Sequence, residues 1–132
     1  MARLFTQAQA KHLGLPGRNS LEIVSGENGA KGLTLRLVEI PVPHPGEVPR
    51  GPHQHSGHEE CIYVLSGQGT TLAESGEYPL KTGDTILIPP GEKHVTRNTG
   101  SVPLLLLCFF PSADISKATV KPAVSSGSPK RQ

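Results

Sequence analysis

The chain has 132 residues and a formal net charge of +2, and this length fits one domain. Its basic excess lies at the carboxyl end, since residues 1–111 hold 9 Lys or Arg and 10 Asp or Glu, whereas residues 112–132 hold 4 and 1. A domain without a basic stripe is a poor candidate for binding nucleic acid. No apolar run approaches the roughly 18 residues of a membrane span, so we expect neither nucleic acid nor membrane as a partner.

The amino-terminal segment and the cysteines favour a cytoplasmic protein. Residues 1–14, MARLFTQAQAKHLG, lack the apolar core of a signal peptide. The two cysteines, Cys61 and Cys108, are expected to be buried small apolar side chains. We therefore expect an intracellular, reducing location.

The first predicted elements are a short helix and a hairpin. Residues 6–13 could form a helix with Thr6 as its N-cap and Gly14 as its stop. Residues 21–40 predict a hairpin with a long turn, because they carry an Asn-Gly turn signal and then the alternating sequence LTLRLVEI.

The rest of the chain is divided into short strands. Residues 41–52, PVPHPGEVPRGP, contain 5 prolines and 2 glycines, so they predict an extended connection. The 15 Gly and 13 Pro of the whole chain are spread along it, which excludes a helical bundle. Closely spaced turn signals are typical of an all-β sandwich or barrel. The later strands are predicted at Thr70–Ala73, Tyr78–Leu80, Thr85–Ile88, His94–Asn98 and Leu104–Phe110.

The composition changes near the carboxyl end. From Ser112 the chain is rich in Ser, Lys, Ala, Pro and Gly and has no periodicity. Such a sequence buries too little apolar surface to offset the entropy lost on ordering. We therefore predict one domain over residues 1–116, with its barrel core at about 20–111, and a flexible basic tail over residues 117–132.

Four residues between positions 53 and 94 predict a metal site. His53 and His55 are two apart, so in a strand they face the same side. Glu60 follows a tight Ser-Gly turn and could supply an oxygen ligand, and His94 would come from a strand across the same cavity. Three imidazoles and a carboxylate suit one divalent transition metal ion, namely Fe, Mn, Ni, Co, Zn or Cu.

These residues carry a resemblance to single-domain cupins. The first cupin motif is a glycine, then HxH, three or four residues, a glutamate, six residues and a glycine, and here HQH is followed by Glu60 and Gly67 at those spacings. In the second motif Gly83, Pro89, Gly91, His94 and Asn98 match at every position. The leading glycine of the first motif departs from the pattern, which affects a loop and no ligand. The resemblance implies a double-stranded β-helix, or jelly-roll barrel, with little helix, and His53, His55, Glu60 and His94 as metal ligands.

Strand parity ranks the neighbours of this site. Glu59 should face away from Glu60 and be solvated. His58 is expected at an exposed turn and is a weak candidate for a proton shuttle, and Arg36 could either bind an anionic substrate inside the barrel or face solvent. Parity also predicts that the side chains of Ile62, Val64, Thr96 and Asn98 face the barrel interior. It predicts that those of Cys61, Tyr63 and Leu65 face outward.

The fold alone does not specify the reaction. The intact ligand set favours a metal-dependent enzyme acting on a small organic molecule, either a dioxygenase or an isomerase, cyclase or lyase. The alternative is a small-molecule-binding or sensing protein without turnover. Outward apolar residues such as Tyr63 and Leu65, together with the resemblance, predict a homodimer.

Overall fold

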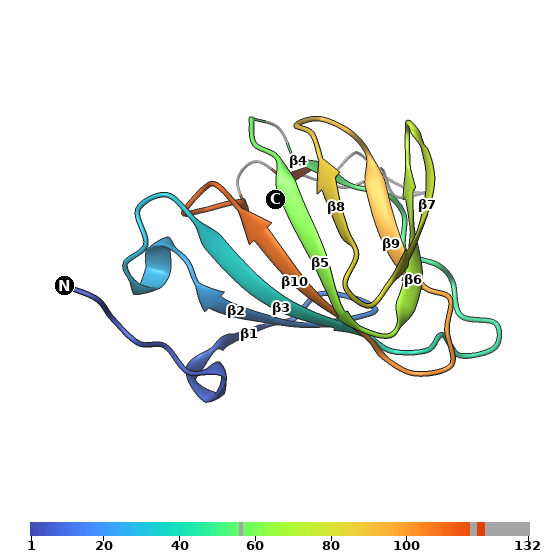
Figure 1. Ribbon diagram of the computed structural model, residues 1–132, viewed down its shortest axis with the longest axis horizontal. Helices are drawn as coiled ribbons and strands as arrows, with labels where there is room; N and C mark the ends of the chain where they lie inside the picture. Colours follow the sequence, from blue (N-terminus) through green and yellow to red (C-terminus); the bar gives the residue numbers. More distant parts are fainter. Residues whose placement is uncertain (56, 117–118, 121–132) are drawn as a thin grey trace.

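The protein is a barrel of short antiparallel strands (Figure 1). The computed structural model describes residues 1–55, 57–116 and 119–120. A six-stranded sheet has the order β1-β2-β3-β10-β5-β8, a three-stranded sheet the order β7-β6-β9, and a two-stranded sheet pairs β11 with β4. The strand bounds are β1 Lys11–Leu13, β2 Asn19–Val24, β3 Thr34–Ile40, β4 Gln54–His55, β5 Glu60–Ser66, β6 Gln68–Ala73, β7 Gly76–Lys81, β8 Thr85–Ile88, β9 His94–Asn98, β10 Leu104–Phe110 and β11 Thr119–Val120.

The core lies between the sheets and follows from period-two alternation. On β10, burial alternates along the strand, with Leu104, Leu106, Cys108 and Phe110 buried and the residues between them less so. Neighbouring β3 and β5 contribute inward residues in the same register, for example Val38 and Val64 opposite Leu106. The apolar run of β10 therefore supplies a core face and also an apolar outer face.

These strands confirm the predicted all-β jelly-roll barrel with little helix. β2 and β3 form the expected antiparallel hairpin, with the 3₁₀ helix η2 (Gly26–Asn28) in its turn. Strands β8, β9 and β10 have the predicted bounds. Within the described part of the chain, no helix combines the length and the apolar character needed to cross a bilayer.

The predicted helix over residues 6–13 is replaced by two shorter elements. Thr6 does cap a 3₁₀ helix, η1 (Gln7–Gln9), but the chain then extends into β1. β1 pairs with β2, with Lys11 opposite Glu22 and Leu13 opposite Ser20. The helix signal was weak because residues 6–13 lack an apolar stripe. Pairing with β2 at the sheet edge satisfies the backbone hydrogen bonds of residues 11–13. Where helix and strand propensities are nearly equal, such tertiary contacts decide the structure.

The predicted tail is described only in part. Thr119 and Val120 pair with His55 and Gln54 of β4. Residues 117–118 and 121–132 lie outside the described residues, so the flexible basic tail stays a prediction, as does the domain boundary at 116.

Gly69 on β6 has no room for a side chain, and we expect Gly69→Ala to be strongly destabilising. A Cβ at this position would collide with the carbonyl oxygen of Arg97 on β9 and would lie 2.6 Å from Cδ2 of Leu104. Since overpacking a core costs about 1–3 kcal/mol, the free energy of unfolding should fall by about 2 kcal/mol in urea titrations. Gly32→Ala is the control, because no atom of the described residues beyond its chain neighbours lies within 4 Å of its added Cβ. Equal unfolding midpoints for the two variants would contradict the packing argument.

Candidate metal centre

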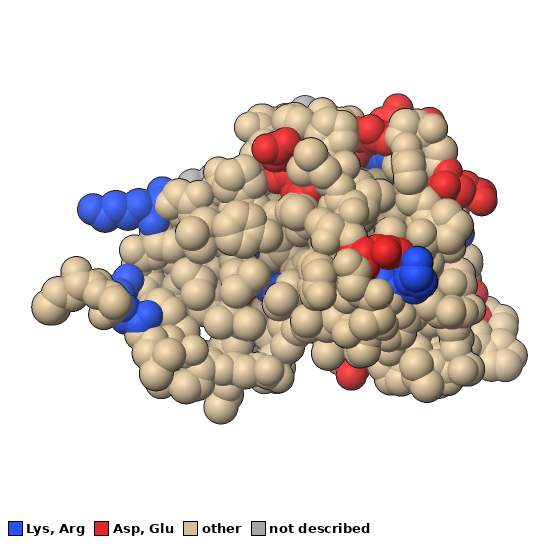
Figure 2. Space-filling model, in the orientation of Figure 1, with Lys and Arg blue, Asp and Glu red and all other residues tan. Residues whose placement is uncertain are grey.

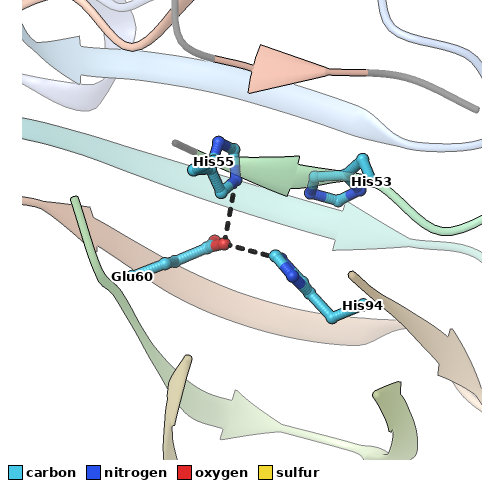
Figure 3. Close-up of side chains that lie close together, drawn as sticks. All are labelled: His53, His55, Glu60 and His94. Atoms are coloured by element: carbon cyan, nitrogen blue, oxygen red, sulfur yellow. Dashed lines mark hydrogen bonds and ion pairs between the residues drawn. The ribbon is translucent and has the colours of Figure 1, made fainter. Parts of the chain in front are cut away.

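Three separate segments bring the predicted ligands together. His55 lies on β4, Glu60 begins β5 and His94 begins β9. His53 precedes β4 and is fixed by two backbone hydrogen bonds with His94, from His53 N to His94 O (2.9 Å) and from His94 N to His53 O (2.7 Å). One candidate ligand atom from each of the four side chains lies within 4.8 Å of all the others. Figure 3 shows the three rings and the carboxylate pointing toward one another.

Glu60 is the electrostatic centre of this cluster. Its Oε1 lies 3.0 Å from Nε2 of His94 and 3.2 Å from Nε2 of His55. Burial alone would raise the pKa of the Glu60 carboxyl, but the hydrogen bonds from His55 and His94 outweigh it and hold that pKa below its usual range. The carboxylate is therefore ionised at neutral pH, as a metal ligand must be.

Two of the histidines have pKa values shifted in opposite directions. Burial, and then the nearby His94, lower the pKa of His53 to about 3, so its imidazole is neutral. Burial also works to lower the pKa of His94, but the hydrogen bond to Glu60 raises it above its ordinary value. Nδ1 of His94 also donates to the carbonyl oxygen of Glu92 at 2.9 Å. That contact orients the ring and leaves Nε2 facing the cluster, an arrangement common among metal-binding histidines.

The donor set fits a divalent transition metal ion. Three imidazole nitrogens and one carboxylate oxygen form a mixed shell of the kind that Fe, Mn, Ni, Co, Zn and Cu accept. The four side chains are half-buried to buried. If His94 loses a proton when the metal binds, metal affinity would depend on pH. We therefore take His53, His55, Glu60 and His94 as the candidate ligands.

Strand parity correctly predicted which of the two adjacent glutamates is buried and which side chains of β5 and β9 face inward. Glu59 is exposed and Glu60 is buried. Ile62 and Val64 face inward, whereas Tyr63 and Leu65 are exposed on the outer side. Thr96 and Asn98 are buried, as predicted. Cys108 is buried, and burial raises the pKa of its thiol, but Cys61 is only half-buried, on the outer face.

The expectation for His58 was wrong. This residue is only 9% exposed, although it follows a backbone turn at Gly57 (φ +85°). Its ring stacks on His55 at a centroid distance of 5.3 Å and meets the ring of Phe110 at 5.9 Å. His58 therefore packs behind a candidate ligand, and it does not line the cavity.

Arg36 faces the barrel interior, which decides between its two alternatives. Its Nη2 lies 3.0 Å from Oε1 of Glu22, and its guanidinium lies 5.8 Å from the centroid of the Phe110 ring. Two of its five N–H groups donate to Oε1 of Glu22, so its charge is compensated by a carboxylate. Arg36 is thus a wall residue of the site.

The candidate ligands line a cavity of about 630 Å³. Its wall also contains Arg18, from the β1–β2 loop, and Arg50, from the proline-rich connection. Sequence reasoning missed both, because strand periodicity says nothing about loop side chains. The one available signal was that each follows a glycine or proline turn and is not flanked by an acid.

A family model described as "Cupin domain" matches residues 42–110, more than half of the chain. The chain belongs to the cupin family. This cupin is 38% identical over 78 residues to an uncharacterized protein, MJ1618, of Methanocaldococcus jannaschii, which is 59% of this chain and 61% of that protein. It is also 37% identical over 60 residues to an oxalate-binding protein of Thermotoga maritima, 46% of this chain and 50% of that protein.

A solved structure extends the likeness to most of the cupin barrel. The structure of Lactobacillus farciminis oxalate decarboxylase in its formate complex matches with a TM-score of 0.71 at 20% identity, over 86% of this chain and 34% of that chain. An identity this low shows the shared fold alone. The matched segment also spans only about half to three fifths of the curated relatives named above.

Proposed function

We propose that this cupin is a divalent-metal-dependent enzyme that converts a small organic molecule in its cavity. The reaction would be a dioxygenase type, or an isomerase, cyclase or lyase type. The observation that supports this is the placement of all four candidate ligands on the wall of one open cavity of about 630 Å³. That volume is typical of small-molecule sites.

The chain's own groups prepare such a site. Bound by His53, His55, Glu60 and His94, a divalent ion would supply a Lewis acid and open coordination positions. Neutral His53 and ionised Glu60 need little rearrangement to act as ligands. The carbonyl of Glu92 holds the His94 ring in orientation, and buried aliphatic side chains such as Ile62 and Leu106 on the cavity wall limit the entry of water.

A binding or sensing function without turnover is the alternative. The Thermotoga maritima relative is named as oxalate-binding, whereas the matching solved structure is named as a decarboxylase. Both kinds of protein would hold a ligand in the same cavity. A measurement of turnover therefore distinguishes an enzyme from a binding or sensing protein, whereas a measurement of ligand binding does not.

Metal analysis and turnover together test the proposal. Elemental analysis of protein purified without added metal and without a nickel column should show about one first-row divalent ion per chain. Turnover of keto acids, enols or catechols should stop after chelation, return when the metal is restored, and be lost in His53→Ala. A protein that binds metal and ligand but converts none of the panel would support the binding alternative. A chain that retains no such metal would contradict both the metal site and the proposed enzyme.

We also propose that two copies pair through the outer face of the six-stranded sheet. Cross-strand neighbours form apolar rows there, such as Leu35–Phe109–Cys61–Leu87. Phe109 is 43% exposed and Leu87 is 59% exposed, and Figure 2 shows few charged side chains over β3, β10 and β5. A broad, mostly apolar face suits an identical face related by two-fold symmetry. Light scattering should give the mass of a dimer at micromolar concentration.

The cytoplasmic location of the protein stays a prediction, which cell fractionation would test.

A further inference from the structure

The cavity carries an excess of positive charge. Four cationic side chains line it, whereas Glu60 is the one acidic residue among its described lining residues, and Glu60 is engaged by His55 and His94. The cations are Lys11, Arg18, Arg36 and Arg50. A concave site with this balance concentrates anions.

Three of these cations already have local partners. Lys11 pairs with Glu27 at 2.9 Å and Arg36 pairs with Glu22 at 3.0 Å. The side chain of Arg50 packs against Gly17, whose backbone has φ +73° and no side chain to obstruct it. Its guanidinium donates to the backbone carbonyl of Thr96, which fixes it in place.

Arg18 is different. Its one hydrogen bond in the described structure runs from Nη1 to the carbonyl oxygen of Pro16, at 3.0 Å, and it makes no ion pair among the described residues. Burial lowers the pKa of its guanidinium, which means that the charge is partly removed from water. A desolvated guanidinium without a carboxylate leaves most of its donors unused, and a bound anion would offset that cost.

A second polar group lines the cavity from the same strand region. Ser20 on β2 is 2% exposed, and its Oγ has no hydrogen-bond partner among the described residues. A buried hydroxyl without a partner is unfavourable. Arg18 and Ser20 are two residues apart and both contribute to the cavity wall, so the β2 side of the cavity offers unused donors for an acceptor group.

The remainder of the wall selects the body of the ligand. Val38, Ile40, Ile62 and Leu106 line the cavity and are buried aliphatic residues. Such a surface favours an apolar body over a polyhydroxylated one. The volume of about 630 Å³ also leaves room for a molecule larger than a two-carbon acid.

We propose that Arg18, assisted by Ser20, is an anion-binding residue of the cavity, and that the ligand is an organic carboxylate with an apolar body. The proposal rests on the proposed function only in taking this cavity as the place where the ligand binds. The planar guanidinium can donate two parallel hydrogen bonds to a carboxylate, and the Ser20 hydroxyl can donate a third.

Matched probes in metal-free protein test the role of Arg18. Phenylacetate and phenylacetamide have nearly the same shape and differ in charge. In the presence of a chelator, calorimetric titration should show phenylacetate binding at least about 10-fold more tightly than phenylacetamide. Arg18→Gln should weaken phenylacetate about 10- to 100-fold and leave phenylacetamide unchanged, and Arg18→Lys should lose less.

Two controls separate binding from folding and from net charge. Lys31→Gln removes one exposed positive charge and should leave phenylacetate binding unchanged. The melting temperature of unliganded Arg18→Gln should equal or exceed that of the wild type, because a half-buried charge without a carboxylate partner is lost. Equal phenylacetate affinity in wild type and Arg18→Gln, equal affinity of the wild type for the two probes, or no binding of either would overturn the proposal. Since the protein is metal-free throughout, none of these results depends on the proposed metal chemistry.

Discussion

Glu60→Gln will lower the affinity of this cupin for a divalent transition metal by at least about 100-fold, whereas Glu59→Gln will leave it unchanged. Outer partners of metal ligands already account for about 10- to 100-fold in affinity, and a direct anionic ligand should account for more. The substitution preserves shape but removes the carboxylate that, among the described residues, lies within 4.8 Å of the three histidine nitrogens. Competition titration with a metal-sensitive dye measures both variants.

Glu59 is a strict control for this experiment. It is adjacent in sequence and chemically identical, yet it is exposed whereas Glu60 is buried. Both substitutions change the net charge by the same amount. Similar losses in the two variants would show that overall charge, and not ligation by Glu60, governs the affinity.

The metal-free protein should carry a second signature of Glu60. Its carboxyl has a folded-state pKa below the ordinary value of 4.5, so it stabilises the fold above pH 4.5 and this contribution is lost as the pH falls below 4.5. The raised pKa of His94 acts in the opposite sense: its contribution is present below the ordinary value of 6.5 and is lost as the pH rises through the raised value. In chelator, the melting temperature of the wild type should therefore fall on both sides of this window, and that of Glu60→Gln should vary less.

The candidate ligands could be identified from sequence because local rules constrain them. His53 and His55 share a side by strand parity, and the spacing to Gly67 that the cupin motif implies favours Glu60 over Glu59. The same rule gave the inward positions of β5 and β9. Such rules hold wherever a strand is regular, and the barrel is built mostly from regular strands.

The missed features lie where the backbone is irregular. His58 lies just outside β5, and its burial comes from ring contacts with His55 and Phe110. Arg18 enters the cavity from a loop, and β1 exists because β2 offers it a sheet edge. In each case the position depends on contacts with residues distant in sequence, and a single sequence without those contacts cannot specify them.

Phe109→Glu will convert the proposed dimer to a monomer. Phe109 projects from β10 at the middle of the outer face, between Leu35 on β3 and Cys61 on β5. In a two-fold interface each substitution places two carboxylates in an apolar contact, one from each copy. An uncompensated buried charge costs several kcal/mol, so dimer affinity should fall by more than about 1000-fold, which light scattering and sedimentation would detect as halved mass.

The same substitution should leave the metal centre intact, because Phe109 faces away from the cavity that Cys108 and Phe110 line. Val102→Glu is the matched control, since Val102 is also an exposed apolar residue (54%) but lies in the β9–β10 loop. It should remain dimeric. A Phe109→Glu protein that binds metal normally and keeps the wild-type mass would show that the apolar rows of β3, β10, β5 and β8 are not the dimer interface. A monomeric wild type would remove the need for an interface on this face, and the exposed apolar rows would then require another explanation.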